Sequence, residues 1–156
     1  MNERFETFTV LITKIARNIK KIKNQEMAGY DLRSPHISCL YYLYIADGLI
    51  AADLCERCEE DKATISRALD YLEENGYTVC ESGLTKRYKI PIHLTEKGMD
   101  AGKRIHDKVN QIMDDVSTGL TEEERIAFYR TLAVISDRLE QYAAPADVRA
   151  ADRQST

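Results

Sequence analysis

The chain has 156 residues, of which 44% are hydrophobic and 31% are charged, with a formal net charge of −4. This length suffices for one domain with its own core, and the composition is typical of a globular protein. The acidic balance argues against a nonspecific polyanion binder, although it is compatible with a local basic surface. The N-terminus has no signal-peptide pattern and no apolar run reaches membrane-spanning length, so we expect a cytoplasmic protein that does not bind membranes.

The first predicted element is a long helix from Asn2 to about Met27, a stretch without Gly or Pro. Its apolar residues recur at alternating steps of three and four, as do the a and d positions of a coiled coil. The N-terminal part of this seam comprises Phe5, Phe8, Ile12 and Ile15. Such a seam needs an apolar partner, which is either the rest of the chain or a second subunit. Packing on the chain's own body is the simpler alternative, and a second subunit is the other, because a terminal helix has few neighbours of its own.

Ser34-Pro35 predicts the start of a second helix, with Ser in the cap position and Pro in the first turn. The residues that follow, up to Ile45, are apolar on more than one face, which is typical of a central, buried helix. Asp47-Gly48 ends this helix, and a short helix from Leu49 to Cys58 comes next.

The segment Asp61–Asn75 predicts an amphipathic helix with an Asp cap, and Gly76 follows as its C-terminal stop. Ile65, Leu69 and Leu72 recur at the spacing of one buried face. The opposite face carries small side chains, hydroxyls and two cations: Lys62, Ala63, Thr64, Ser66 and Arg67. Such a face can enter a major groove, where hydroxyls reach phosphates and Arg pairs with guanine. Taken alone, this helix is equally well explained as a solvated amphipathic helix.

Two short helices joined by a turn at Glu59-Glu60, the second with a polar leading end, predict a helix-turn-helix. The segments Tyr77–Glu81 and Arg87–Leu94 are rich in β-forming residues and predict a β-hairpin, with Pro91 indicating an edge strand. A hairpin in this place is a wing, and cations at its tip suit contact with phosphates or the minor groove. These cations are Lys86 and Arg87.

Two further helices are predicted after the hairpin, one from Thr95 to Gly119 and one that begins at Thr121 with a capping box. The second helix has an apolar seam at heptad spacing. The seam comprises Phe128, Leu132, Ile135 and Leu139. From Ala143 onward, small and polar residues predict a mobile tail.

This order of elements resembles the MarR family of bacterial winged-helix regulators over roughly residues 3–142. The local matches are D-K-A-T-I-S-R-A-L-D-Y-L-E-E-N-G-Y at residues 61–77 and I-H-L-T-E-K-G at residues 92–98. The resemblance implies an obligate homodimer whose N-terminal and C-terminal helices interlock. It also implies that the two recognition helices enter successive major grooves of a pseudo-palindromic operator, and that the protein is a repressor that responds to a small-molecule effector.

We therefore predict a mainly α fold, a winged helix-turn-helix with six helices, a β-hairpin wing and a helical dimerisation region formed by both termini. Residues 1–142 form this domain, with a DNA-binding lobe at about 34–94 and dimerisation helices at about 3–27 and 95–142. Residues 143–156 form the tail. The predicted partners are double-stranded DNA, a second copy of the chain and a small-molecule effector.

The resemblance assigns base and phosphate contacts by position. They fall on Lys62, Ala63, Thr64, Ser66 and Arg67 of the recognition helix and on Lys86 and Arg87 of the wing. Where the family has an Asp before two basic wing residues, this chain has Thr85. Glu59-Glu60 would repel phosphates that it faced, so we expect it to point away. These departures motivate an alternative function, a winged-helix dimer that acts through protein contacts without binding DNA. The intact basic cluster argues against this alternative: Lys62, Arg67, Lys86 and Arg87.

Other candidate sites are weaker. Tyr30, His36, Tyr41, Tyr42 and Tyr44 lie near the start of the buried helix, where the family's ligand cleft falls. They suit an aromatic ligand and a plain core equally well, so we assign no ligand-binding residues. The spacing of the histidines does not indicate a metal site, and we expect no cofactor. The sequence contains no arrangement of residues typical of a catalytic site, so we do not predict an enzyme.

The four cysteines are expected to be free thiols: Cys39, Cys55, Cys58 and Cys80. Cys55 and Cys58 form a C-x-x-C without a second ligand pair, so we interpret them as small core residues rather than as a metal site. Cys39 and Cys80 are also expected to be buried. A thiol sensor that changes DNA affinity on oxidation is the alternative.

Overall fold

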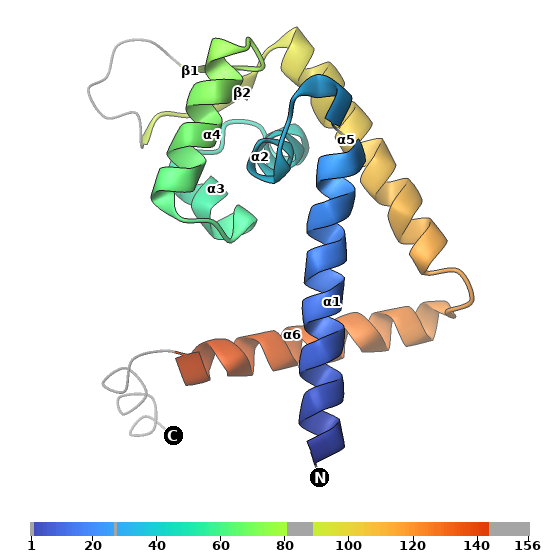
Figure 1. The fold of residues 1–156 in the computed structure, drawn as a ribbon. Helices are drawn as coiled ribbons and strands as arrows, with labels where there is room; N and C mark the ends of the chain where they lie inside the picture. Colours follow the sequence, from blue (N-terminus) through green and yellow to red (C-terminus); the bar gives the residue numbers. More distant parts are fainter. Residues whose placement is uncertain (1, 27, 81–88, 144–156) are drawn as a thin grey trace. The chain divides into compact units, whose positions relative to one another are not determined.

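The structure, a computed structural model, describes residues 2–26, 28–80 and 89–143 (Figure 1). Its elements are α1 (Asn2–Glu26), the 3-10 helix η1 (Ala28–Tyr30), α2 (Ser34–Ile45), α3 (Ala51–Cys58), α4 (Lys62–Glu74), β1 (Thr78–Cys80), β2 (Ile92–Leu94), α5 (Glu96–Val116) and α6 (Glu122–Ala143). The predicted mainly α winged helix-turn-helix fold is confirmed. The chain forms two compact units, one that ends at Asn110 and one that begins at Gln111.

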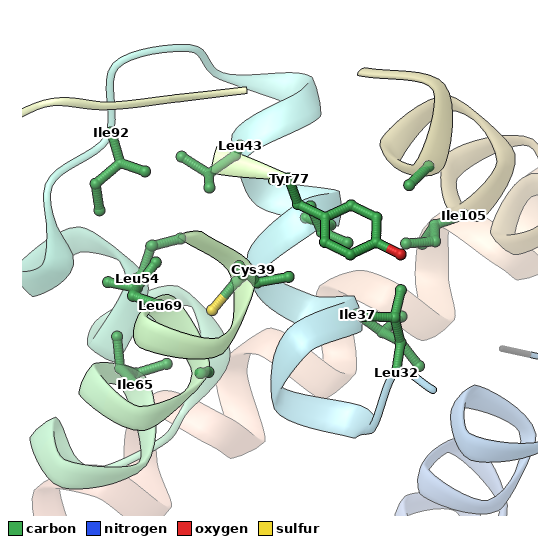
Figure 2. Close-up of a cluster of buried hydrophobic side chains, with 14 of the residues drawn as sticks. Leu32, Ile37, Cys39, Leu43, Leu54, Ile65, Leu69, Tyr77, Ile92 and Ile105 are labelled. Atoms are coloured by element: carbon green, nitrogen blue, oxygen red, sulfur yellow. The ribbon is translucent and has the colours of Figure 1, made fainter. Parts of the chain in front are cut away.

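Helix α2 lies at the centre of the first unit because its apolar side chains face several directions at once. Leu40 has no exposed surface, and Ile37 and Leu43 are buried as well. The helix packs against α1, α3, α4 and β2. Figure 2 shows Ile37, Cys39 and Leu43 of α2 within the same cluster as side chains from α3 and α4. The prediction of a central, buried helix is confirmed.

The start of α2 differs from the prediction that Ser34 occupies the cap position. Arg33 is the capping residue, and its backbone N–H donates to His36 Nδ1 at 3.1 Å. Ser34 is the first helical residue, and its N–H donates to Asn24 Oδ1 of α1 at 2.9 Å. Because the first N–H groups of a helix have no partner within it, these two bonds satisfy them and attach α1 to the start of α2.

Strands β1 and β2 form an antiparallel pair. The register pairs Thr78 with Leu94, Val79 with His93 and Cys80 with Ile92. The second strand is shorter than predicted, because Lys89 and Ile90 lie outside it and it begins only at Ile92. Pro91 immediately precedes the strand, as expected of a residue that has no N–H for the ladder. The predicted tip of the hairpin falls outside the described residues.

Two glycines bring α5 close to the rest of the first unit. A Cβ on Gly98 would overlap the carbonyl oxygen of Tyr77, and a Cβ on Gly102 would lie 2.8 Å from Tyr44 Cβ. At the same junction, Thr95 N–H donates to Tyr77 O at 3.0 Å and its hydroxyl donates to Gly76 O at 2.7 Å. The absence of a side chain at residue 98 therefore lets the start of α5 lie against the backbone that leads into β1.

Helix α6 begins with the predicted capping box. Thr121 N–H donates to Glu124 Oε2 at 2.8 Å, and Glu124 N–H donates to Thr121 Oγ1 at 3.2 Å. None of the described residues of α6 is buried. Among the described helices of both units, none combines the length and the hydropathy that crossing a membrane requires.

We expect Gly98→Ala to destabilise the protein by about 1–3 kcal/mol, because the new methyl group would overlap backbone atoms that cannot move independently. Gly29→Ala is the matched control, since a Cβ at residue 29 meets nothing within 4 Å. Urea unfolding of both variants measures the difference. Equal midpoints for the two variants would contradict the close packing of α5 described above.

Candidate nucleic-acid interface

Helix α4 has one face in the core of the first unit. Ile65 and Leu72 have no exposed surface, and Ala68 and Leu69 are also buried. These side chains pack against α2 and α3 (Figure 2). The predicted apolar stripe of this helix is therefore confirmed, and the opposite face must point outward.

The outward face carries the residues that we predicted to contact DNA. Lys62, Ala63, Ser66 and Arg67 are exposed, whereas Thr64 is half-buried. All five lie in the first half of α4, and so the structure brings them together on one helical surface. The two predicted wing residues, Lys86 and Arg87, lie outside the described residues.

A chain of hydrogen bonds fixes the first turn of α4. Asp61 is the cap: one carboxylate oxygen accepts from Thr64 N–H at 2.8 Å, and the other accepts from the Thr64 hydroxyl at 3.1 Å. The backbone bond from Thr64 and then its hydroxyl hold the pKa of the Asp61 carboxyl below its ordinary value. The Thr64 hydroxyl in turn accepts from Arg67 Nη2 at 3.3 Å. The predicted cap is confirmed, and it also orients the arginine one turn later.

The turn between α3 and α4 depends on a left-handed residue. Glu59 has φ 54° and ψ 42°, an uncommon conformation for a residue with a side chain. It allows Glu59 N–H to donate to Glu56 O and Glu60 N–H to donate to Cys55 O, which ends α3. Glu59 is exposed and Glu60 is half-buried. Their expected orientation away from DNA phosphates stays a prediction.

A second contact supports α4 from the side of α2. The His36 ring stacks on the Tyr71 ring, with centroids 4.3 Å apart and planes inclined by 7°. The Tyr71 hydroxyl donates to Asp31 O at 3.0 Å. Burial lowers the pKa of His36, as does the Arg33 cation, which keeps the ring neutral and able to accept from Arg33 N–H. Sequence analysis missed both contacts of Tyr71, because no local spacing relates it to His36 or to Asp31, which is 40 residues away.

A groove with a volume of about 540 Å³ lies between α1 and the start of α2. Its lining comprises Lys20, Asn24, Asp31, Leu32, Arg33, Ser34 and Pro35. Two of the aromatic residues that sequence analysis weighed as a ligand cleft do not line this groove and instead contact His106. The ring centroids of Tyr41 and His106 are 6.2 Å apart, and those of Tyr44 and His106 are 5.4 Å apart. Sequence patterns gave no signal for the groove, because its polar walls come from two separate segments.

The residues predicted to form a dimer interface are largely exposed. The Phe5 side chain lies outside the described part, Phe8 is half-buried, and Ile12 and Ile15 are exposed. On α6, Leu132 and Ile135 are half-buried. The other two seam residues, Phe128 and Leu139, are exposed.

The four cysteines are free, as predicted. Cys39 is buried, whereas Cys55 and Cys58 are half-buried at the edge of the core. The prediction that Cys80 is buried is wrong: it is half-buried, because it ends a strand of only three residues in a two-stranded sheet. Within residues 2–26, 28–80 and 89–143, no group of three or more His, Cys, Asp and Glu side chains is arranged to hold a metal ion.

Comparison with known proteins finds similar proteins in the MarR family. A MarR family sequence model matches residues 30–85. The uncharacterized HTH-type transcriptional regulator YwoH of Bacillus subtilis (strain 168) is 26% identical over 117 residues, which are 75% of this chain and 85% of that protein. The crystal structure of a MarR family transcriptional regulator from Silicibacter pomeroyi has a TM-score of 0.70 and 26% identity, covering 80% of this chain and 84% of that one. The chain is thus similar to MarR family transcriptional regulators in sequence and in fold.

A second similar structure contains DNA. The S. aureus MepR–DNA complex has a TM-score of 0.74 and 21% identity, covering 85% of this chain and 96% of that one, which shows the shared fold. The relatives from Bacillus subtilis and Silicibacter pomeroyi are both named as transcriptional regulators.

We expect Asp61→Ala to destabilise the protein by about 1 kcal/mol, because two N-terminal donors of α4 lose their acceptor. Glu74→Ala is the control: it removes an exposed carboxylate at the C-terminal end of the same helix, where a negative charge is unfavourable. Urea unfolding at pH 7 measures both. A loss that is the same in both variants would show that the cap contributes nothing of its own.

The difference in the free energy of unfolding between the wild type and Asp61→Ala should also depend on pH. The folded-state pKa of Asp61 is depressed, so its contribution is present above the ordinary value of 3.8 and is lost as the pH falls below it. Unfolding curves measured between pH 7 and pH 3 should therefore converge at the acid end. A difference that stays constant down to pH 3 would be inconsistent with a carboxylate cap.

Proposed function

We propose that this protein is a member of the MarR family and a homodimeric repressor, which binds a pseudo-palindromic operator through α4 and releases it when a small-molecule effector binds. The observation that carries the proposal is the exposed face of α4, which combines small side chains, a hydroxyl and two cations at the start of a helix whose other face is buried. The buried face orients this surface before DNA arrives, so binding costs little reorganisation.

The chemistry of this face suits the major groove. Ala63 and Ser66 are small enough to allow close approach of the helix to base edges. Lys62, in the first turn, is suited to a phosphate, whose charge is also favoured by the helix dipole. Arg67 donates to Thr64 with one of its N–H groups, and its guanidinium has further donors for a bidentate contact with guanine.

The terminal helices support the proposal of a dimer. In α1, Ile12, Ile15 and Ile19 are 37%, 49% and 49% exposed, and they share one seam. In α6, Phe128 and Leu139 are 51% and 53% exposed. Apolar seams of this length are rare on the surface of a monomer and are typical of protein interfaces. A dimer would present two α4 helices to half-sites separated by about 34–36 Å along B-DNA.

The groove between α1 and α2 supports an effector site. Lys20 and Arg33 supply positive charge on its wall, Leu32 and Pro35 supply apolar surface, and Asp31 is the opposing carboxylate. This combination suits a small organic acid. Because Asn24 and Ser34 in the same wall join α1 to α2, a ligand here would change the spacing of the two recognition helices.

Selection of bound fragments from sheared genomic DNA, followed by anisotropy titration of the best fragment, tests the function as a whole. We expect a palindromic site and a steep decrease in affinity with salt concentration. No enrichment by a well-folded dimer would favour the alternative, a winged-helix protein that acts through protein contacts. The contribution of Lys86 and Arg87 stays a prediction, to be measured in the same titration.

We expect Arg67→Ala to weaken binding to the selected site by about 1–3 kcal/mol and to relax the preference for one base pair, because a bidentate contact is lost. Arg130→Ala removes an exposed arginine from α6 and is the charge-matched control. Anisotropy titrations against the site and its single-base variants give both quantities. If Arg67→Ala weakened all sequences equally, Arg67 would be a phosphate contact and not a base contact.

We expect Ile15→Glu to shift the protein from dimer to monomer, because it places a charge in the proposed interface. Ile45→Glu is the matched control, since Ile45 is an isoleucine of similar exposure, 47%, outside the terminal helices. Sedimentation velocity over a range of concentrations distinguishes the two states. A dimer that persists in Ile15→Glu and dissociates in Ile45→Glu would move the interface to another surface.

A further inference from the structure

Tyr71 joins α4 to the connector that precedes α2. Its hydroxyl donates to Asp31 O at 3.0 Å and to Asp31 Oδ2 at 3.3 Å, and its ring stacks on His36 with centroids 4.3 Å apart. Arg67 precedes Tyr71 by four residues, so the two side chains are neighbours on the surface of α4. A displacement of the helix at Tyr71 is therefore felt at Arg67, the residue assigned to base contact.

The partners of the two stacked rings belong to the wall of the groove between α1 and α2. Asp31, which accepts from Tyr71, lines this groove, and so does Arg33, whose N–H donates to His36 Nδ1 at 3.1 Å. Asp31 and Arg33 are both exposed, so a solute in the groove can reach them. Each of the two rings that support α4 is thus held by a residue of the groove wall.

The backbone of Asp31 is left-handed, with φ 56°. Asp and Asn adopt this conformation more readily than most residues with a side chain, but it is still less favourable than the extended or right-handed regions. The bond from Tyr71 requires the carbonyl oxygen of Asp31 to face α4, and so it helps to hold this conformation. Without that bond, Asp31 loses a restraint on an unfavourable backbone.

The charges in the groove make Asp31 sensitive to an anion. Lys20 and Arg33 supply two cations to the wall, and Asp31 supplies a carboxylate. An organic acid that pairs with the cations brings a second negative charge into the same groove, where it repels the Asp31 carboxylate. Displacement of Asp31 relieves this repulsion, because the residue is exposed and only weakly favoured in its left-handed conformation.

We propose that Asp31 and Tyr71 are positioning residues through which an organic anion in the groove acts on α4. Repulsion displaces Asp31, the Tyr71 hydroxyl loses its acceptor, and α4 tilts at the turn that carries Arg67. A tilt in each subunit changes the spacing of the two recognition helices. This last step rests on the proposed function, whereas the connection from the groove to Tyr71 does not depend on DNA binding.

NMR of the full chain with 13C-labelled tyrosine rings tests that connection without DNA. The signal of Tyr71 is assigned by its loss in Tyr71→Phe, and its stacking on His36 distinguishes it by an upfield shift. Benzoate is the probe, because it is a small organic acid with one carboxylate. We expect benzoate to move the Tyr71 signal in the wild type and to leave it in place in Asp31→Asn, which removes the charge and still tolerates a left-handed backbone.

Lys20→Gln is the matched control for the groove, because it removes one cation and leaves the bond between Asp31 and Tyr71 intact. We expect this variant to bind benzoate more weakly and to reach the same Tyr71 signal at saturation. Three results would each overturn the proposal: a Tyr71 signal that benzoate does not move, an equal movement in Asp31→Asn, or an unchanged benzoate affinity in Lys20→Gln.

Titration of the selected operator then measures the effect on α4. Tyr71→Phe keeps the ring and removes the bond to Asp31, so we expect its operator affinity to fall by roughly 2–12-fold, the equivalent of one hydrogen bond. Benzoate should lower the wild-type affinity by a similar factor and leave that of Tyr71→Phe unchanged. Tyr41→Phe is the matched control, since it removes a tyrosine hydroxyl from α2, outside α4.

Equal responses of the wild type and Tyr71→Phe to benzoate would overturn the step from Tyr71 to the operator. Failure of the protein to bind any DNA without benzoate would count against the proposed function. It would leave the connection from the groove to Tyr71 standing, because the NMR titration alone decides that connection.

Discussion

The burial of α2 on several sides is the constraint on which the first unit depends. A helix with apolar residues all round must be covered by other elements, and here α1, α3, α4 and β2 cover it. The orientation of α4 follows from this packing, because Ile65, Leu69 and Leu72 have to face α2 and α3. Its polar surface therefore points outward as a result of hydrophobic packing, without any contribution from a DNA contact.

Polar contacts fix the position of α4 further, in addition to the hydrophobic packing. At the start of α4, every third residue from the cap carries a polar side chain: Asp61, Thr64 and Arg67. This spacing puts the three side chains on one side of the helix, where they form a continuous series of hydrogen bonds. On the far side, Tyr71 stacks on His36 and donates to Asp31. Helix α4 is thus held at its N-terminal turn by a local motif and nearer its C-terminal end, at Tyr71, by a tertiary one.

The difference between these two kinds of contact explains what the sequence could and could not predict. The cap of α4, its apolar stripe and the capping box of α6 involve residues within one or two turns, so spacing reveals them. Spacing assigned the cap of α2 to Ser34, but the cap is Arg33, and the N–H of Ser34 is bonded to Asn24, ten residues earlier. The exposure of Cys80 and the groove beside α1 depend on how separate segments meet, which no local pattern encodes.

The end of α1 links the dimer proposal to the DNA-binding helices. The hydrogen bonds that hold α1 to α2 involve Lys23 and Asn24, near the C-terminus of α1. Ile12 and Ile15, nearer the N-terminus of α1, have exposed apolar surface. A helix of this kind gains little stability from its sequence alone and needs a partner along its length. Because the groove lies beside this same junction, a ligand there and a partner on the seam would act on one element. Coupling between the two follows if α1 moves as a rigid helix, since its rotation would be transmitted through Asn24 to the first turn of α2.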